Sequence, residues 1–360
     1  MAVTSADRRN RLRTLLADTD LSGLLVTDLI NVRYLSGFTG SNAALWVSAD
    51  DPAGDRISTD GRYLTQVAEQ APDLALIEGR DVWRTLVEAV DGERLGFEKH
   101  VVTVAQYDDA QQGSAEPDRL QGADPLVERL REVKDAAEVE LIARACAVGD
   151  AALATLIEGG AIRPGRTERQ VARDLEWAMF ECGGEAIAFE TIVAAGANSA
   201  VPHHRPTEAV LAAGDFVKID FGSVVGGYHS DMTRTFVLGE PADWQEEIYS
   251  IVAQAQRVGC EALEPGVPTR EIDAAARQII EDAGFGDKYV HGLGHGVGLQ
   301  IHEAPGVGKL ATGTLRAGSV VTVEPGIYLP GKGGVRIEDT LAVGDGVRSL
   351  TSSCRELVAL

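Results

Sequence analysis

Apolar and polar positions divide the first part of the chain into alternating helical and strand-like segments. The pattern predicts a helix at Arg9–Leu16, a strand at Gly23–Val26 and a further helix at Trp83–Val90, which follows an apolar stretch at Leu74–Ile77. A stretch rich in Gln, Gly, Pro and Asp at 111–125 has the composition of a domain boundary. We therefore expect an N-terminal α/β domain over residues 1–127.

The remaining residues, 128–360, contain a weak internal repeat. Pro164–Thr167 opens a helical run, and about a hundred residues later Pro265–Thr269 opens another. Strand-like segments follow each run. Pro, Gly and Thr are common helix openers, so the echo could also arise without duplication. A true repeat predicts a pseudo-twofold α+β domain whose site lies between the halves.

Charge and composition exclude several classes of partner. The chain has 33 Lys and Arg against 55 Asp and Glu, a net charge of −22, which repels nucleic acid and anionic membranes. No uncharged run reaches the length of a membrane helix, and Ser5–Asp20 lacks the apolar core of a signal peptide. We therefore expect a cytoplasmic protein. The four cysteines lie far apart, so we expect them to be small buried hydrophobes: Cys146, Cys182, Cys260 and Cys354.

Most of the histidines gather in one window, which marks it as the place to look for a site. Six of the seven fall between residues 203 and 302, namely His203, His204, His229, His291, His295 and His302. The same window contains a predicted β-hairpin with a Gly226–Gly227 turn and an aspartate, Asp220 or Asp231, on each strand.

The position of the hairpin turn decides how the two aspartates meet. With the loop centred near Val225–Gly226, Asp220 and Asp231 would be directly opposed, and two like charges so placed need a cation between them. With the loop centred on Gly226–Gly227, the register slips and one aspartate is left in solvent. The hairpin pattern alone leaves both readings open.

The histidine-rich segment that follows contains unusually many glycines. The segment from His291 to His302, which includes His295, has four glycines within its first eight positions. This forbids a stable helix and allows close backbone approach to a bound group. It lacks the Lys-Ser/Thr of a phosphate-binding loop, so the histidines favour metal or proton chemistry.

Two further carboxylates end or follow apolar strands. Glu324 directly follows the apolar run Val320–Val323, at the end of the predicted strand, which is a costly place for a carboxylate without a partner. Arg336 and Glu338 are two residues apart, so on a strand they share a face. Asp, Asp, His, Glu and Glu together form an oxygen-rich donor set that suits a pair of divalent ions, Mn²⁺ or Co²⁺ first, with Zn²⁺ or Fe²⁺ also compatible.

The order and surroundings of these residues resemble the pita-bread metallopeptidases, and within them the Xaa-Pro branch of Xaa-Pro dipeptidase (prolidase) and aminopeptidase P. Segments 31–44 and 59–63 resemble the N-terminal domain of that family. The resemblance implies a pseudo-twofold pita-bread α+β catalytic domain, residues 128–360, preceded by a smaller creatinase-like α/β domain. The motifs that carry it are IDFG at Asp220, SDMTRTF at Asp231, GLGHGVGLQIHE at His295, VEPG at Glu324 and GGVRIED at Glu338.

The resemblance also implies a role for each residue. Asp220 would chelate one metal, Asp231 and Glu338 would bridge both, and His295 with Glu324 would complete the shell of the second. Four other side chains would act nearby: His203 on the substrate, His302 beside the scissile carbonyl, His291 as the outer histidine of the loop, and Arg336 holding Glu338 and Asp231.

The expected activity is metal-dependent hydrolysis of the Xaa-Pro bond of dipeptides or peptide N-termini, by attack of a hydroxide that bridges two divalent metals. Glu324 would relay a proton to the leaving proline nitrogen, while His302 and His203 would stabilise the oxyanion. We expect the substrate to be a proline-containing di- or oligopeptide and the enzyme to be a homodimer.

Three alternatives share parts of this pattern. A methionine aminopeptidase uses the same five ligands without such an N-terminal domain, whereas creatine amidinohydrolase and a non-catalytic binding member of the fold would have lost ligands that are intact here. Some prolidases clamp the dipeptide carboxylate with an arginine after the HExP segment. Gly306 stands there in this chain, which favours tolerance of longer peptides.

Overall fold

The computed structural model describes residues 3–111 and 117–360. The chain divides into two compact units, Met1–Arg131 and Glu132–Leu360. The expected boundary between residues 127 and 128 falls inside a helix of the first unit, α6 (Leu126–Arg131). Within the expected boundary stretch 111–125, β6 (Leu120–Ala123) joins the sheet of the first unit, and residues 112–116 lie outside the described residues.

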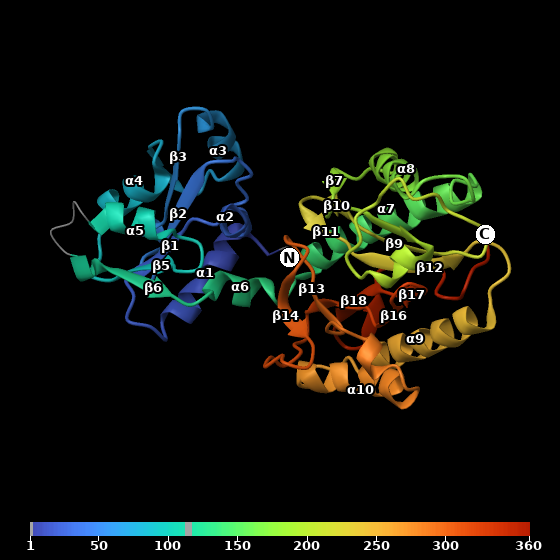
Figure 1. Cartoon of the computed structure of the whole chain (residues 1–360). Coiled ribbons are helices and arrows are strands. Elements are labelled where there is room, and N and C mark those ends of the chain that lie inside the picture. The colour runs from blue at the N-terminus through green and yellow to red at the C-terminus, as the bar shows by residue number, and fades with distance from the viewer. Residues whose placement is uncertain (1–2, 112–116) are drawn as a thin grey trace. The chain divides into compact units, whose positions relative to one another are not determined.

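The first unit is built on a mixed six-stranded sheet with the order β4-β3-β2-β1-β5-β6 (Figure 1). β1 pairs antiparallel with β2 and parallel with β5, so the sheet changes direction at its centre. The strands before β6 are β1 (Gly23–Val26), β2 (Ala43–Ser48), β3 (Arg56–Thr59), β4 (Ala75–Glu78) and β5 (Leu95–Glu98).

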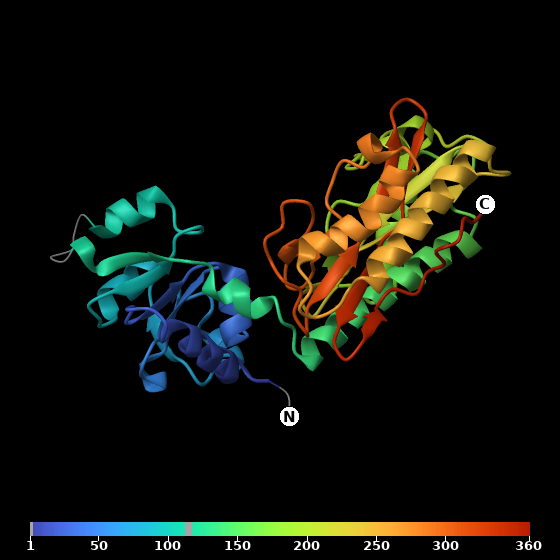
Figure 2. The ribbon, with the colours of Figure 1, turned by 90° about the horizontal axis from the view of Figure 1, so that it is seen from below.

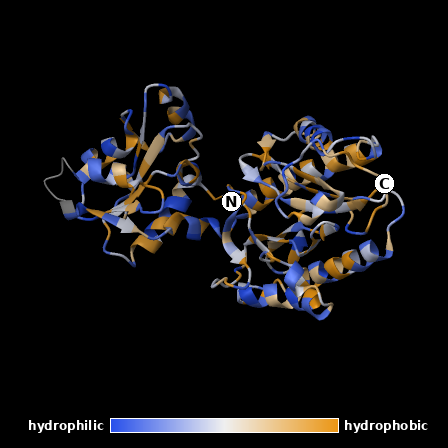
Figure 3. Ribbon diagram, in the orientation of Figure 1, coloured by the Kyte–Doolittle hydropathy of each residue, from blue (hydrophilic) through white to orange (hydrophobic). Residues whose placement is uncertain are grey.

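Helices cover both faces of this sheet, as the continuous apolar sequence of β1 requires. Leu25 and Trp46 pack with Trp83 of α4 on one face, while Leu24 and Leu45 are buried on the other. Figure 3 shows these strands as mostly hydrophobic ribbon. The predicted α/β class is confirmed. The helices are α1 (Ser5–Leu16), α2 (Leu29–Ser36), α3 (Leu64–Gln70), α4 (Val82–Ala89) and α5 (Val104–Gln111), besides α6.

The second unit consists of two helix-plus-sheet halves. The first half contains α7 (Ala136–Glu158), α8 (Glu168–Glu181), β7 (Ala186–Ile187), β8 (Ile192–Ala195), β9 (Phe216–Phe221), β10 (Ser223–Val225), β11 (Tyr228–His229) and β12 (Met232–Val237). The second contains α9 (Asp243–Glu261), α10 (Thr269–Asp282), β13 (Gly294–Gly296), β14 (Glu303–Val307), β15 (Val320–Val323), β16 (Gly326–Leu329), β17 (Gly333–Arg336), β18 (Asp339–Val343) and β19 (Val347–Ser349).

The two halves repeat the same arrangement. α7 packs against α8, and α9 packs against α10. Figures 1 and 2 both show α9 and α10 lying side by side. The segment before α8 forms a bridge from Thr167 to Val210, and the segment before α10 forms the equivalent bridge from Pro268 to Thr314. The predicted α+β class is therefore confirmed, with β-strands of both halves between the two helix pairs.

The hairpin around Gly226–Gly227 adopts the second of the two expected registers. Val225 pairs with Tyr228, and both glycines have positive φ (58° and 79°), as a two-residue turn of this kind requires. Asp220 consequently lies opposite Thr233 and not opposite Asp231. The expectation that this register leaves one aspartate in solvent is wrong, because Asp220 and Asp231 are 7% and 4% exposed.

Asp220 and Asp231 lie on the same face of the hairpin in either register. Moving the loop centre by one residue moves each cross-strand partner by two, and side chains alternate with a period of two. Asp231 is two residues from Thr233, so it stays on the face of Asp220 as a diagonal neighbour.

The cysteines only partly follow expectation. All four are free, and Cys146 is buried, but Cys182 and Cys354 are exposed and Cys260 is intermediate. Among the helices in the described part of the chain, none has the length and apolarity of a membrane span.

Candidate metal centre

Three predicted ligands converge in the second unit: His295 on β13, Asp231 directly before β12 and Glu338 directly before β18. Asp231, His295 and Glu338 each offer one donor atom, and these atoms all lie within 4.8 Å of one another. His295 Nε2 is 3.4 Å from Asp231 Oδ2 and 3.5 Å from Glu324 Oε1. The structure therefore brings together three ligands that are between 43 (295 to 338) and 107 (231 to 338) positions apart in the chain.

Glycines on either side of His295 let its strand enter this crowded place. A Cβ on Gly294 would lie 2.1 Å from the carbonyl oxygen of Thr322, and one on Gly296 would lie 2.3 Å from that of Ala304. β13 is thus squeezed between β14 and β15, and only glycine fits on both sides of the histidine.

The carboxylates of the centre repel one another. Burial, followed by the nearby charges of Asp220 and Glu324, raises the pKa of Asp231 well above its usual value. The pKa of Glu338 is raised in the same way, by burial and then by Asp231 and Glu324, and burial also raises that of Glu324. Asp220 Oδ1 is buried without a hydrogen-bond partner among the described residues.

Neutral hydrogen-bond donors hold the carboxylates in place. Thr233 Oγ1 donates to Glu338 Oε2 at 2.6 Å, and Thr322 Oγ1 lies 3.4 Å from Glu324 Oε1. Sequence reasoning missed both threonines, although each lies on a strand within two residues of a predicted ligand, on the same face.

Arg336 makes different contacts from those expected. We expected it to hold Glu338 and Asp231, but its Nη2 pairs with Asp220 Oδ2 and its Nε lies 3.9 Å from Glu324 Oε2. The hairpin register explains this, because Asp220 and Thr233 pair directly and Arg336 Nε also donates to Thr233 Oγ1 at 3.0 Å. The guanidinium is fully buried.

His291 and Tyr328 support Arg336 from behind. Tyr328 OH accepts from Arg336 Nη1 at 2.9 Å and contacts His291 Nε2 at 2.8 Å. Burial, aided by Arg336, lowers the pKa of His291 to about 3, so its ring is neutral at physiological pH. Sequence reasoning missed Tyr328, which lies four residues after Glu324.

The donor residues open into a cavity of about 290 Å³. Its walls include His203 and His302, and the His302 ring packs edge-on against His295 with 4.3 Å between centroids. Partial burial and then the neighbouring His295 and His203 lower the pKa of His302, so it is a neutral donor at pH 7. His291 is absent from the described lining residues, and it lines a separate depression with Gly306.

A single buried carboxylate fixes the loop that carries His203. Glu168 opens α8 and is fully buried, and its oxygens accept from Ala195 N at 2.8 Å, Asn198 Nδ2 at 2.9 Å and Thr207 N at 2.9 Å. His204 Nε2 lies 2.8 Å from the same carboxylate. Burial alone would raise the pKa of Glu168, but these hydrogen bonds outweigh it and lower the pKa.

Buried cations hold the other end of this loop. Lys218 Nζ donates to the carbonyl oxygens of Val201 and Pro202 at 2.6 and 3.2 Å, and Arg336 Nη1 donates to that of Pro202 at 3.2 Å. His203 is therefore fixed on both sides although its loop contains no helix or strand. No sequence pattern marked Glu168 or Lys218, because the partners of both are backbone atoms or side chains of a loop without periodicity.

The second half anchors its histidine loop in a related way. Asp273 of α10 is paired with Arg277 by two contacts of 2.8 Å, and it accepts from Leu293 N at 3.0 Å. Arg277 Nη2 donates to the carbonyl oxygen of His291 at 2.7 Å. A buried acid on the second helix of each half thus holds one histidine loop.

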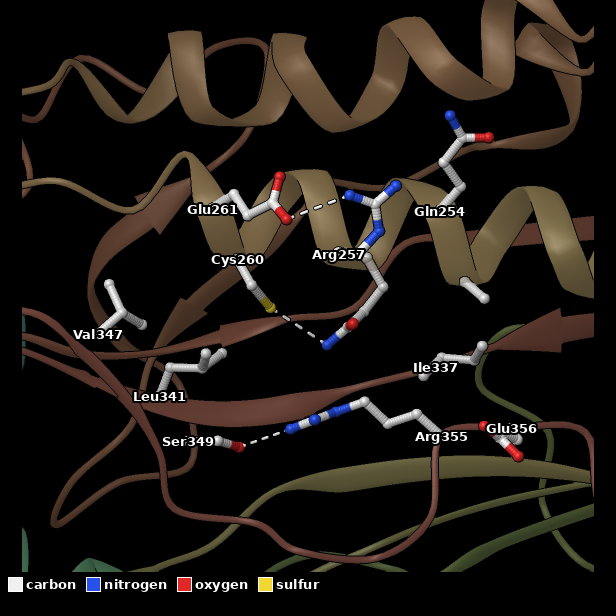
Figure 4. Close-up of a pocket in the computed structure, with 12 residues that line it drawn as sticks. Gln254, Arg257, Cys260, Glu261, Ile337, Leu341, Val347, Ser349, Arg355 and Glu356 are labelled. Atoms are coloured by element: carbon white, nitrogen blue, oxygen red, sulfur yellow. Dashed lines mark hydrogen bonds and ion pairs between the residues drawn. The ribbon is translucent and has the colours of Figure 1, made fainter.

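A larger cavity of about 860 Å³ lies between α9 and β18–β19 (Figure 4). Arg355 reaches Ser349 across it, and Arg257 pairs with Glu261 at its rim. At its base Asp339 is buried between Arg355 and Arg234. Because Asp339 directly follows Glu338, this ionic cluster fixes the strand that supplies one of the converging donors.

The family models match both units. One described as "Metallopeptidase family M24" matches residues 140–345, more than half of the chain, and one described as "Creatinase/Prolidase N-terminal domain" matches residues 8–133. This chain belongs to metallopeptidase family M24. The resemblance inferred from the motifs is confirmed, and so is the pita-bread fold with an N-terminal domain.

Relatives of this M24 peptidase match along almost its whole length. An uncharacterized peptidase of Bacillus subtilis is 37% identical over 97% of the chain and 99% of its own length. The structure of an Xaa-Pro dipeptidase from Bacillus anthracis has a TM-score of 0.94 at 36% identity and covers 99% of this chain and 100% of that one. An X-Pro aminopeptidase structure from Thermotoga maritima has a TM-score of 0.88 at 32% identity and covers 98% and 99%.

Replacing Asp231 with Asn should stabilise the metal-free M24 peptidase at pH 7.5 by about 1–2 kcal/mol, because it removes a buried carboxylate that repels its neighbours. A carboxyl whose folded-state pKa is raised costs stability above its unfolded value, so the gain should vanish as the pH falls toward 4. Urea unfolding of chelator-treated protein at both pH values measures it. Asp339→Asn is the matched control. It should lower the free energy of unfolding at pH 7.5, since ion pairs lower the pKa of Asp339.

Glu168→Gln should reduce kcat/KM about tenfold or more while metal content stays unchanged, because a buried charged acceptor is lost and His203 is no longer held. Steady-state kinetics together with metal analysis check this. Glu208→Gln is the control, since Glu208 lies in the same loop but pairs with Arg169 at the exposed surface. Equal kinetics in the two variants would show that the anchor does not matter.

Proposed function

We propose that this chain is an Xaa-Pro peptidase that uses two divalent metal ions, Mn²⁺ or Co²⁺ first. The observation that carries the proposal is the convergence of Asp231, His295 and Glu338, with Glu324 beside them, in one cavity whose carboxylates repel one another. Such a donor set fits hard or borderline dications, which would remove the repulsion and give Asp220 Oδ1 a partner. The names of the Bacillus anthracis and Thermotoga maritima neighbours support the Xaa-Pro substrate class.

The proposed ligands are Asp220, Asp231, His295, Glu324 and Glu338. The ions supply Lewis-acid polarisation of a peptide carbonyl and lower the pKa of water. The protein contributes the rest: Arg336, Thr233 and Thr322 orient the carboxylates through the contacts described above. These supports fix donor positions before any ion arrives.

The histidines at the cavity wall would act on the substrate. His302 and His203 would donate hydrogen bonds to the oxyanion that develops on the scissile carbonyl. The lowered pKa of His302 suits this role, since a neutral imidazole donates without adding charge beside His295. Glu324 would carry a proton to the leaving proline nitrogen. His291 would act through Tyr328 and Arg336.

The matched N-terminal domain and the complete donor set argue against the alternatives. A methionine aminopeptidase would not carry an N-terminal unit of this kind, and a non-catalytic member would lack ligands. The proposed partner is a proline-containing peptide. The expectations of a homodimer, of a cytoplasmic location and of no nucleic-acid or membrane partner stay predictions.

Removing metal should abolish hydrolysis of Ala-Pro, and Mn²⁺ or Co²⁺ should restore it, because the carboxylates alone offer no electrophile. Exhaustive chelation, dialysis and titration with each ion measure this. Ala-Pro cleavage that survives complete chelation would disprove the metal mechanism. Mg²⁺ and Ca²⁺ serve as comparison ions, since both provide charge but bind histidine poorly.

His302→Asn should lower kcat by about a hundredfold, as expected for loss of an oxyanion donor, with both metals retained. Glu324→Gln should lose activity and metal together. Metal analysis beside kinetics separates the two, and His100→Asn in the N-terminal unit is the control. Loss of a full metal equivalent in His302→Asn would make His302 a ligand.

A further inference from the structure

The loop 201–207 contributes His204 and Arg205 to the cavity lining besides His203, and among the described lining residues Arg205 is the only lysine or arginine. The loop is held rigidly by Glu168 on one side and by Lys218 and Arg336 on the other. A cation on this loop is therefore presented from a fixed backbone.

Arg205 can exchange its present partner, Glu190, for another carboxylate. Its Nε lies 3.0 Å from Glu190 Oε2, but the two side chains are 83% and 61% exposed. An ion pair in water contributes little, so an incoming carboxylate can replace Glu190 at small cost. An arginine stays protonated at any physiological pH and binds a carboxylate with two parallel hydrogen bonds.

Arg205 lies two residues beyond His203, whose backbone is in a turn, so their Cα atoms are at most about 7 Å apart. Pro206 favours an extended backbone at Arg205 itself. His204, between them, is turned to Glu168. If His203 contacts the scissile carbonyl, Arg205 reaches one residue further along the peptide, where an Xaa-Pro dipeptide ends in its carboxylate.

We propose that Arg205 binds the C-terminal carboxylate of an Xaa-Pro dipeptide and makes dipeptides the preferred substrates. This inference rests on the proposed Xaa-Pro activity. It departs from the tolerance of longer peptides that Gly306 suggested, because Gly306 lines a different depression and its lack of a cation says nothing about this cavity. A peptide that continues beyond proline offers Arg205 a neutral amide instead of a carboxylate.

The test compares Ala-Pro with Ala-Pro amide, two substrates that differ only in the terminal charge, on the full-length Mn²⁺-loaded enzyme. Wild type should prefer Ala-Pro in kcat/KM by about tenfold or more, as one charge-assisted hydrogen bond predicts. Arg205→Gln should bring the ratio close to one, mainly through the KM for Ala-Pro, and Arg205→Lys should restore part of it. Glu190→Gln should raise the ratio, since it frees the guanidinium.

Arg169→Gln is the matched control. Arg169 is also an exposed arginine (61%, against 83% for Arg205) that pairs with Glu208, directly after the loop, and neither is among the described lining residues of the cavity. Its variant should keep the wild-type ratio. Calorimetric binding of L-proline and L-prolinamide to wild type and Arg205→Gln gives a readout that does not need turnover, and only wild type should favour L-proline.

The outcomes separate the two claims. A wild type that cleaves Ala-Pro, with the same ratio in Arg205→Gln as in Arg169→Gln, overturns the role of Arg205 and leaves the Xaa-Pro activity standing. A metal-loaded wild type that cleaves neither substrate overturns the proposed function and this inference with it. Loss of the ratio in Arg205→Gln alone supports both.

Discussion

The mutual repulsion of buried carboxylates is the constraint on which the second unit depends. Asp231, Glu324 and Glu338 are brought together by segments that are far apart in sequence, and burial raises the pKa of each carboxyl group. A flexible site would relieve this repulsion by moving apart. The strands prevent that, because β9–β12 and β13–β15–β18 are hydrogen-bonded sheets packed on apolar cores. The fold therefore keeps a high negative potential in place, and a cation is its natural complement.

Different residues position the carboxylates and the histidine loops. Thr233 and Thr322 orient carboxylates, while Arg336 neutralises part of their charge and is steadied by Tyr328. The histidine loops are anchored separately, by Glu168 in one half and by the Asp273–Arg277 pair in the other. A buried ion pair of 3.1 Å, Lys134 with Glu303, stands directly after His302. Donor positions and substrate-facing positions thus have separate anchors, apart from Arg336, which contacts both Asp220 and the carbonyl oxygen of Pro202 in the His203 loop.

The sequence allowed the convergence of Asp231, His295 and Glu338 to be predicted because these residue types, in these surroundings, carry strong local signals. Glu324 ends an apolar strand, and the two aspartates flank a Gly-Gly turn. The register of that turn could not be predicted, since only the backbone geometry of Gly226 and Gly227 fixes it, yet the face was kept because the slip is even.

The partners of Arg336 and the anchor Glu168 were beyond prediction for another reason. Their contacts join loops and strands that no periodicity links, so only the folded backbone brings the atoms within reach. Arg205 illustrates the same limit, because nothing in the local sequence distinguishes an arginine at a cavity wall from one in open solvent.

The last strand of the site depends on residues near the end of the chain. Arg355 locks Asp339, and the backbone of 358–360 pairs with Val237 and Gly239 of the first half. During synthesis, Asp220 and Asp231 leave the ribosome long before these residues do. Chains grow at about 5–20 residues per second, so the aspartates wait several seconds for their partners. The proposed site would therefore reach its final geometry only after residues 355–360 have left the ribosome.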